Sequence, residues 1–345
     1  MANVLVVGGA GYVGGGIADR LLEMGHAVRV YDCLLYEDVY LKPVDFVYGD
    51  IRDESRLRPH LRWADAAVWL AAIVGDGACS LDPQLTREIN VGSVRWLAKN
   101  FDRRVLFMST CSVYGAVDGL LDEGSATNPL SLYAQTKLEA EAALAGTGAI
   151  VFRLGTLFGL GDAYSRIRMD LAPNTLTVKA CLYGKISVFG GEQYRPLLHV
   201  RDVAEAVAAN VATEHAGIFN LHKVNLRISE LADRILEHVP NVAVQRTEMK
   251  FQDSRNYRVS SRKAEEAFGF APKRTVDDGI REIRRLVEEG RIRDISSPRY
   301  SNTDFLRPLL VRERTPLGFE VTRNQRLNAY RLAQTEDARR ATGRG

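Results

Sequence analysis

The sequence predicts an α/β fold in which a doubly wound parallel sheet is followed by a smaller C-terminal lobe. The first 150 residues alternate short β-branched runs with segments of helical periodicity. Near-continuous apolar strands separated by helices are typical of a parallel sheet that is covered on both faces. A glycine-rich turn, Gly8 to Gly14, joins the first strand to the first helix. Together these observations predict a Rossmann-type sheet.

The elements of the first part of the chain follow from the spacing of apolar residues. In the first helix, for example, Ile17, Leu21 and Met24 recur at helical spacing. Strands are predicted over residues 4–7, 27–31, 46–48, 67–70, 105–108 and 150–153. Helices are predicted between them over residues 15–24, 86–100 and 132–144.

After Arg153 the elements become shorter and the loops richer in glycine and charge. Strands are predicted over residues 186–189 and 217–221, and helices over residues 171–183, 202–212, 229–238, 262–268 and 276–289. We therefore expect residues 1–154 to form the sheet domain. Residues 155–290 are expected to form a smaller lobe that returns at least once to the main sheet.

The last 55 residues differ from the rest in charge, because residues 291–345 hold 12 basic and 6 acidic side chains. They show little periodicity. The sequence leaves open whether this basic tail is partly disordered, packs on the body or packs on a partner subunit. Since it shows no long apolar face, we expect it to be dispensable for the folding of residues 1–290.

Composition excludes several classes of protein. The chain has 345 residues, of which 46% are hydrophobic, so it can bury a large core. Residues 1–290 carry 34 basic and 37 acidic side chains, which gives no reason to expect a nucleic-acid partner. The longest apolar run, residues 66–75, has half the length of a membrane span. The spacing of the four cysteines and six histidines suggests neither a metal site nor disulfides, and together with the lack of an export signal this favours the cytoplasm.

The glycine-rich turn predicts a dinucleotide site. Gly8, Gly11 and Gly14 would allow a tight turn and bring the backbone close to a pyrophosphate at the N-terminus of the following helix. Asp32 ends the second strand, where a carboxylate can bind a ribose diol and repel a 2′-phosphate. The expected cofactor is therefore NAD. The alternatives are a turn that serves packing only and an aspartate that caps the next element.

Further cofactor contacts are expected where the next strands end. Asp50 and Ile51 follow the third strand, where they could meet the adenine, although Asp50 could equally be a turn residue. Small side chains end the fourth strand, which suits a backbone that passes near a cofactor; simple strand packing is the alternative. The predicted cofactor set is Gly8, Gly11, Tyr12, Val13, Gly14, Asp32, Asp50, Ile51, Leu70, Ala71, Ala72, Tyr133 and Lys137.

A catalytic site is predicted where Tyr133 and Lys137 share one face of a helix. A free tyrosine, with a pKa of about 10, is a poor base at neutral pH. A nearby ammonium group and a positively charged nicotinamide would favour its phenolate. Thr110 ends the fifth strand, where its hydroxyl could hold the substrate oxygen that Tyr133 deprotonates.

These motifs resemble those of the extended short-chain dehydrogenase/reductases that act on nucleotide sugars. The resemblance rests on the glycine turn and on Met108-Ser-Thr-Cys-Ser-Val-Tyr-Gly115, Ser131-Leu-Tyr-Ala-Gln-Thr-Lys137 and Arg195-Pro-Leu-Leu-His-Val-Arg-Asp202, and it covers roughly residues 1–290. It implies an NAD-binding domain over residues 1–154, a nucleotide-sugar lobe over residues 155–290 and a homodimer. It also implies catalysis by Thr110, Tyr133 and Lys137. The implied substrate contacts are Thr110, Ser112, Asn174, Arg195, Lys250 and Arg255, with Arg195 on the diphosphate.

Cys111 and Ser112 depart from the family pattern. The 4,6-dehydratases of this family carry Asp-Glu directly after the catalytic threonine, where this chain has Cys111-Ser112. A thiol for proton transfer occurs in 3,5-epimerases, but one residue later, where Ser112 stands. Cys111 therefore either transfers a proton or fills space behind the strand. Thr156 is a further departure, because the 4-epimerases usually have asparagine there.

The resemblance and these departures favour an NAD-dependent nucleotide-sugar epimerase that transiently oxidises C4 and returns the hydride. The second hypothesis is a dehydratase or 3,5-epimerase that uses Cys111. A third, from another class, is a non-catalytic NAD-binding regulator. Intact Thr110, Tyr133 and Lys137 argue against the regulator, because a sensor needs the glycine turn but no base.

Overall fold

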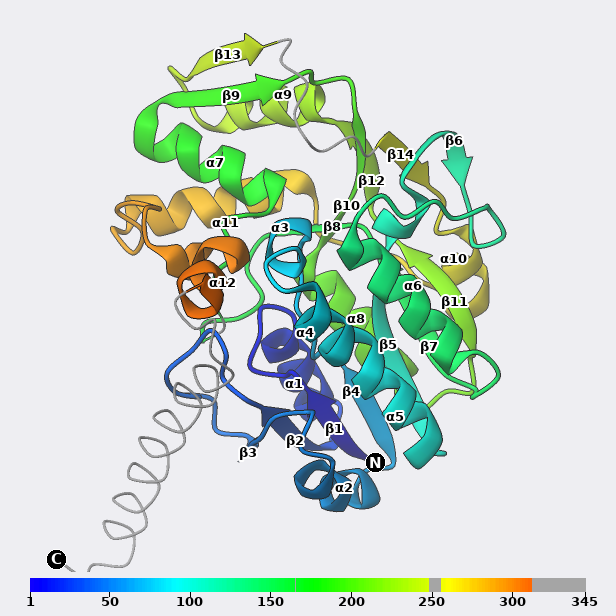
Figure 1. The fold of residues 1–345 in the computed structure, drawn as a ribbon. Coiled ribbons are helices and arrows are strands. Elements are labelled where there is room, and N and C mark those ends of the chain that lie inside the picture. The colour runs from blue at the N-terminus through cyan, green and yellow to red at the C-terminus, as the bar shows by residue number, and fades with distance from the viewer. Residues whose placement is uncertain (165, 248–255, 312–345) are drawn as a thin grey trace, which may run out of the picture.

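The computed structural model describes residues 1–164, 166–247 and 256–311. Its centre is a seven-stranded parallel sheet in the order β11-β7-β5-β4-β1-β2-β3 (Figure 1). The strands are β1 (Asn3–Val7), β2 (Ala27–Asp32), β3 (Asp45–Tyr48), β4 (Ala66–Trp69), β5 (Arg104–Thr110), β7 (Ile150–Leu154) and β11 (Gly217–Leu221). The predicted doubly wound α/β fold is confirmed.

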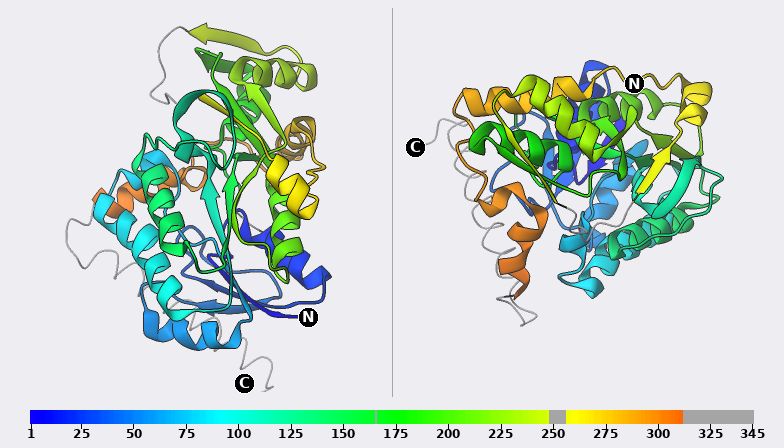
Figure 2. Two further views of the ribbon diagram at one scale, coloured as in Figure 1. Left: turned by 90° about the vertical axis from the view of Figure 1, so that its right-hand side faces the viewer. Right: turned by 90° about the horizontal axis from the view of Figure 1, so that it is seen from above.

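Each face of the sheet is covered by helices because side chains alternate along each strand. On β1, Val4 and Val6 pack into one core and Leu5 and Val7 into the other. The first core is closed by α1 (Gly14–Glu23), α8 (Val200–Asn210) and α10 (Arg262–Phe268). The second is closed by α2 (Glu54–Trp63), α5 (Ser93–Asn100) and α6 (Leu132–Leu144). The left view of Figure 2 shows these two helical layers.

The C-terminal lobe stands at the carboxyl edge of the sheet (Figure 1). Its own core joins α7 (Ala172–Tyr183), α9 (Ile228–His238) and α11 (Val276–Glu288) to short strands. These strands are β8 (Thr156–Phe158), β9 (Lys185–Phe189), β10 (Tyr194–His199), β12 (Val224–Arg227) and β13 (Ala243–Thr247). Between them the chain returns to the main sheet, where β11 pairs with β7.

Several elements were not predicted. They include α2, the strands β8, β10, β12 and β13, and a parallel pair formed by β6 (Ala116–Leu121) and β14 (Asn256–Val259). The helix predicted over residues 86–100 is interrupted: α4 (Pro83–Arg87) and α5 are joined by a π-helical turn, Glu88–Gly92. Asn90 in this turn bonds both the N–H and the C=O of Ile73 at 2.8 and 2.9 Å, so it holds the loop that follows β4.

The first part of the tail packs on the body, which is one of the three possibilities that the sequence left open. Ile292 is 1% exposed, and α12 (Asn302–Val311) packs on α3 (Asp76–Cys79) and buries Leu306 to 1% exposure. Figure 1 shows α12 beside the sheet domain rather than extended away from it. Residues 312–345 lie outside the described part of the chain. No helix among the described residues combines the length and apolarity needed to cross a bilayer.

Candidate active site

The glycine turn lies between β1 and α1, and its shape depends on two glycines. Gly8 has a φ of +82°, and a Cβ there would stand 2.4 Å from the backbone nitrogen of Ala71. At Gly14 a Cβ would stand 2.4 Å from the carbonyl oxygen of Gly9. Close packing is thus a sufficient reason for glycine at both positions, with or without a bound dinucleotide. The N-terminus of α1 has no side-chain cap, and Val13 and Gly14 at this end of the helix line the same cavity as the turn.

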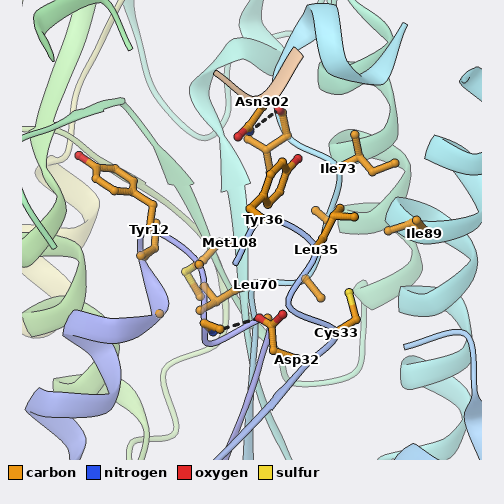
Figure 3. Close-up of a pocket in the computed structure, with 18 of the residues that line it drawn as sticks. Tyr12, Asp32, Cys33, Leu35, Tyr36, Leu70, Ile73, Ile89, Met108 and Asn302 are labelled. Atoms are coloured by element: carbon orange, nitrogen blue, oxygen red, sulfur yellow. Dashed lines mark hydrogen bonds between the residues drawn. The ribbon is translucent and has the colours of Figure 1, made fainter. Parts of the chain in front are cut away.

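Asp32 is held at the end of β2 by two backbone amides. Its carboxylate oxygens accept hydrogen bonds from Leu34 at 2.7 Å and from Ala10 at 3.0 Å (Figure 3). Burial raises the pKa of Asp32, while these amides counteract the shift. The carboxylate is thus fixed in the cavity with lone pairs left for a ribose diol.

Asp50 lines the same cavity but is already paired. It is 7% exposed and forms a salt bridge of 2.7 Å with Arg52, whose backbone N–H also donates to it. This pairing supports the interpretation of Asp50 as a turn residue. Ile51 beside it presents the apolar surface that an adenine ring would need.

One cavity, the cofactor cavity, brings together all the residues predicted to bind the cofactor. Figure 3 labels Tyr12, Asp32 and Leu70 among them. It runs from the glycine turn and Asp32 to Tyr133 and Lys137. The length and chemistry of this lining fit a dinucleotide, with a diol acceptor at one end and a base at the other. The cavity is also lined by residues that sequence reasoning missed, notably Leu35, Tyr36, Ile73, Val74, Ile89, Met108, Arg166, Arg168 and Asn302.

Tyr133 stands where the cofactor cavity meets a second cavity, the substrate cavity. Ser109, Tyr133 and Arg168 line both. Burial raises the pKa of Tyr133, and its hydrogen bond with the Thr110 side chain acts in the opposite direction. A phenol in this environment needs additional positive charge before it can act as a base.

Lys137 lies one helical turn after Tyr133 on α6. Its Nζ donates to the carbonyl of Met108 at 2.8 Å and lies 4.7 Å from the centre of the Phe107 ring. Burial lowers the pKa of Lys137 to about 8. Burial therefore disfavours the ammonium form of Lys137, while Cys79 and Glu141 favour it.

The substrate cavity contains part of the predicted substrate set. Thr110, Ser112 and Arg195 line it, and Arg195 is 5% exposed with one N–H bonded to the Tyr194 carbonyl at 2.8 Å. Asn174 lines neither cavity: its amide accepts from Gly159 N–H and donates to the Arg168 carbonyl, at 3.0 and 2.9 Å. It positions the 159–168 loop. Lys250 and Arg255 lie outside the described residues.

Cys111 is not placed for proton transfer. It is completely buried in a small apolar cluster with Val113, Tyr114 and Tyr257, and it lines neither cavity. Its thiol donates to the Arg153 carbonyl at 3.2 Å, and burial raises its pKa. A protonated thiol that faces the core argues against the tentative catalytic assignment of Cys111 and favours its alternative interpretation as a space-filling residue.

A buried ion pair, which sequence reasoning missed, links α6, the helix that carries Tyr133 and Lys137, to strand β7. Glu141 lies one turn beyond Lys137 on α6 and pairs with Arg153 of β7 at 2.7 Å. Both residues are 5% exposed or less. Ser109 donates to the same carboxylate. The signal was present in the sequence, because residues 133, 137 and 141 recur at helical spacing.

Comparisons with known proteins identify the family of this chain. The model of the NAD dependent epimerase/dehydratase family matches residues 4–221. A UDP-glucose 4-epimerase of Streptomyces lividans is 29% identical over 78% of this chain and 91% of its own. The UDP-glucuronic acid 4-epimerase of Bacillus cereus, solved with UDP-glucuronic acid and NAD, has a TM-score of 0.73 at 21% identity, covering 83% of this chain and 99% of that one. The dTDP-glucose 4,6-dehydratase of Streptomyces venezuelae, solved with NAD bound, has a TM-score of 0.72 at 26% identity, covering 83% and 97%.

Proposed function

Because the chain belongs to the NAD dependent epimerase/dehydratase family, we propose that it is an NAD-dependent nucleotide-sugar 4-epimerase. The observation that carries this proposal is the position of Tyr133, which lines both the cofactor cavity and the substrate cavity. A base at that junction can reach a sugar hydroxyl whose carbon faces the cofactor. A non-catalytic NAD-binding regulator would have no use for this arrangement.

Each catalytic residue has a separate task in this proposal. NAD, when bound, supplies a reversible hydride acceptor. The Tyr133 phenolate takes the proton from the C4 hydroxyl and later returns it. Lys137 stabilises the phenolate, and the Thr110 hydroxyl orients the sugar oxygen. Arg195, fixed and buried at the wall of the substrate cavity, pairs with the diphosphate of the nucleotide sugar.

The residues after Thr110 do not supply the acid and base that the alternative reactions of this family use. Elimination of water by a 4,6-dehydratase of this family uses the Asp-Glu pair after the threonine, where this chain has Cys111-Ser112. Asp170 lines the substrate cavity but is engaged by Arg168 at 2.8 Å. The thiol of Cys111 faces the core. Epimerisation at C4 needs none of these groups, because the hydride leaves and returns at one carbon.

The test is to incubate the protein with UDP-, dTDP- and GDP-hexoses in D₂O and to analyse the products by mass spectrometry and NMR. A 4-epimerase gives a product of unchanged mass, inverted at C4, with no deuterium on carbon. Loss of one water would instead identify a dehydratase. Deuterium at C3 or C5 would identify an epimerase that acts next to a transient ketone.

The variant Cys111→Ala distinguishes a simple 4-epimerase from an enzyme that uses the Cys111 thiol for proton transfer. If the thiol only fills space, the variant keeps its turnover, and its free energy of unfolding falls by about 1–2 kcal/mol. Urea unfolding and the same product assay measure both quantities. Loss of product with intact reduction of NAD by the sugar would restore Cys111 to the mechanism and refute a simple 4-epimerase.

A further inference from the structure

Arg166 is a buried cation at the cofactor cavity that the mechanism above does not use. It lies in the loop between β8 and α7, is 6% exposed and lines the cofactor cavity. Its Nη2 group has no hydrogen-bond partner among the described residues. A guanidinium that is removed from water and only partly bonded is costly, so such groups are rare unless an anion completes them.

The side chain of Arg166 is held in place by the beginning of the C-terminal tail. Its Nε donates to the carbonyl of Arg299 at 2.6 Å and its Nη1 to Oδ1 of Asn302 at 2.5 Å. The guanidinium also lies 4.2 Å from the centre of the Tyr36 ring. Asn302 is anchored in turn, because its amide donates to the Val74 carbonyl at 2.8 Å. The orientation of the unpartnered Nη2 is therefore fixed.

No carboxylate among the described residues forms a salt bridge with this guanidinium. Asp170 nearby is bound by Arg168 at 2.8 Å and by the backbone N–H of Asn302 at 2.9 Å. Glu37 lies 4.0 Å from Arg299. Burial, followed by the charge of Arg168, lowers the pKa of Arg166 to about 10. The charge of Arg166 thus has no counter-ion among the described residues, and an anionic ligand would compensate it.

We propose that Arg166 binds the diphosphate of NAD from the side of the cavity that faces the glycine turn. The diphosphate is the anionic group of NAD. Asp32 is placed to hold the adenosine ribose and Tyr133 with Lys137 to hold the nicotinamide end, so the diphosphate lies between them. Tyr12 of the glycine turn and Arg166 both line the cofactor cavity. In Figure 3, Tyr36 and Asn302, which both contact Arg166, lie on the side of the pocket away from Asp32.

Two kinds of donor would then hold the diphosphate. The uncapped N-terminus of α1 offers backbone amides without a full charge, and Arg166 adds a charge-assisted hydrogen bond. The C-terminal tail becomes part of the cofactor site, since it supplies two of the three contacts that hold Arg166. This inference rests on NAD as the cofactor and does not depend on which sugar reaction follows.

The experiment compares ligands with and without a diphosphate on the full-length chain. After any copurified nucleotide has been measured and removed, calorimetry gives dissociation constants for NAD, ADP and adenosine. For Arg166→Gln we expect NAD and ADP to bind about ten- to a hundredfold more weakly and adenosine to bind almost unchanged. Arg166→Lys, which keeps the charge without the planar fork, should fall between the two.

Arg299→Gln is the matched control. It removes a positive charge from a side chain that is 61% exposed, and it keeps the backbone carbonyl that Arg166 binds. Its affinities for all three ligands should equal those of the wild type. It therefore distinguishes the specific contact from the general effect of charge near the cavity.

Three results would overturn the inference. Equal weakening of ADP and adenosine in Arg166→Gln would mean that the cavity was disturbed as a whole. Unchanged affinity for NAD would mean that the guanidinium does not reach the cofactor. Weakened binding of nucleotide sugars alone would place it in the substrate site. A failure of the product assay above, with NAD affinity still dependent on Arg166, would refute the proposed reaction and leave this inference intact.

Discussion

At the scale of single residues, the proposed chemistry depends on the phenol of Tyr133. Burial raises its pKa, and the charge of Arg168 and the hydrogen bond with Thr110 oppose that effect. Tyr133 and Lys137 come from successive turns of α6, so any motion of that helix moves both. The protonation state of Tyr133 therefore depends on the charges and hydrogen bonds around one face of α6.

Tyr133→Phe should lose turnover by about 10²–10⁴-fold, because it removes the group that accepts the proton. The ring still fills its space, so the bound NAD and the affinity for the nucleotide sugar should stay as in the wild type. Steady-state kinetics and calorimetry measure the two effects. Turnover close to that of the wild type would revive the regulator hypothesis.

The lowered pKa of Lys137 leads us to expect that the stability of the chain without cofactor depends on pH. Its pKa is about 8 in the folded protein and about 10.4 in an unfolded chain. Between these values the unfolded chain binds the additional proton, so the free energy of unfolding rises with pH by roughly 3 kcal/mol in total.

This contribution can be isolated as the difference between the wild type and Lys137→Met. Urea unfolding from pH 7 to pH 10.5 should show the wild type gaining stability relative to the variant above pH 8. The other titrating groups contribute equally to both proteins. Parallel stability curves would mean that the folded protein does not depress the pKa of Lys137.

At the scale of elements, α6 is fastened to the sheet by the Glu141–Arg153 ion pair. Glu141→Gln leaves the Arg153 guanidinium, which is 3% exposed, without its carboxylate. We expect the free energy of unfolding to fall by about 3–5 kcal/mol. Glu139→Gln is the control: its carboxylate is on the exposed side of α6, where a pair with Arg87 contributes about 0–1 kcal/mol.

Turnover adds a second readout to this comparison. Glu141 also accepts a hydrogen bond from Ser109, which lines both cavities. Loosening α6 should therefore reduce kcat in Glu141→Gln and leave Glu139→Gln unaffected. Equal stability of the two variants would show that the buried pair does not fasten the helix.

At the scale of the whole molecule, the tail joins the sheet domain to the lobe. Ile292 packs with Met169 and Ile283, while Leu306 packs with Ile73 and Cys79 near Tyr133. A chain that ends at residue 291 loses these contacts and the partners of Arg166. It should unfold at a lower temperature and bind NAD more weakly than a chain that ends at residue 311.

Differential scanning fluorimetry and calorimetry on the two shortened chains make this comparison. The chain that ends at residue 311 keeps α12, so the difference between them reports that helix and the segment before it. Identical melting temperatures and NAD affinities would restore the sequence-based expectation that the tail is dispensable for folding.

The sequence by itself determined the parts of the site that are local. The strand, turn and helix around Gly8 to Gly14 are contiguous, and Tyr133 and Lys137 need only one helix to meet. The strands of the sheet can also be predicted from the sequence, because burial on both faces gives them nearly continuous apolar runs. Contacts between near neighbours need no knowledge of the rest of the fold.

Tertiary structure alone decided the parts that depend on distant segments. The Arg166–Asn302 contact joins residues 136 positions apart, and no periodicity in either segment indicates it. The burial of Cys111 depends on β14, and the role of the tail depends on the groove that Ile73 and Cys79 offer to Leu306. The free energy of each of these contacts comes from packing between elements and not from the preference of any one segment.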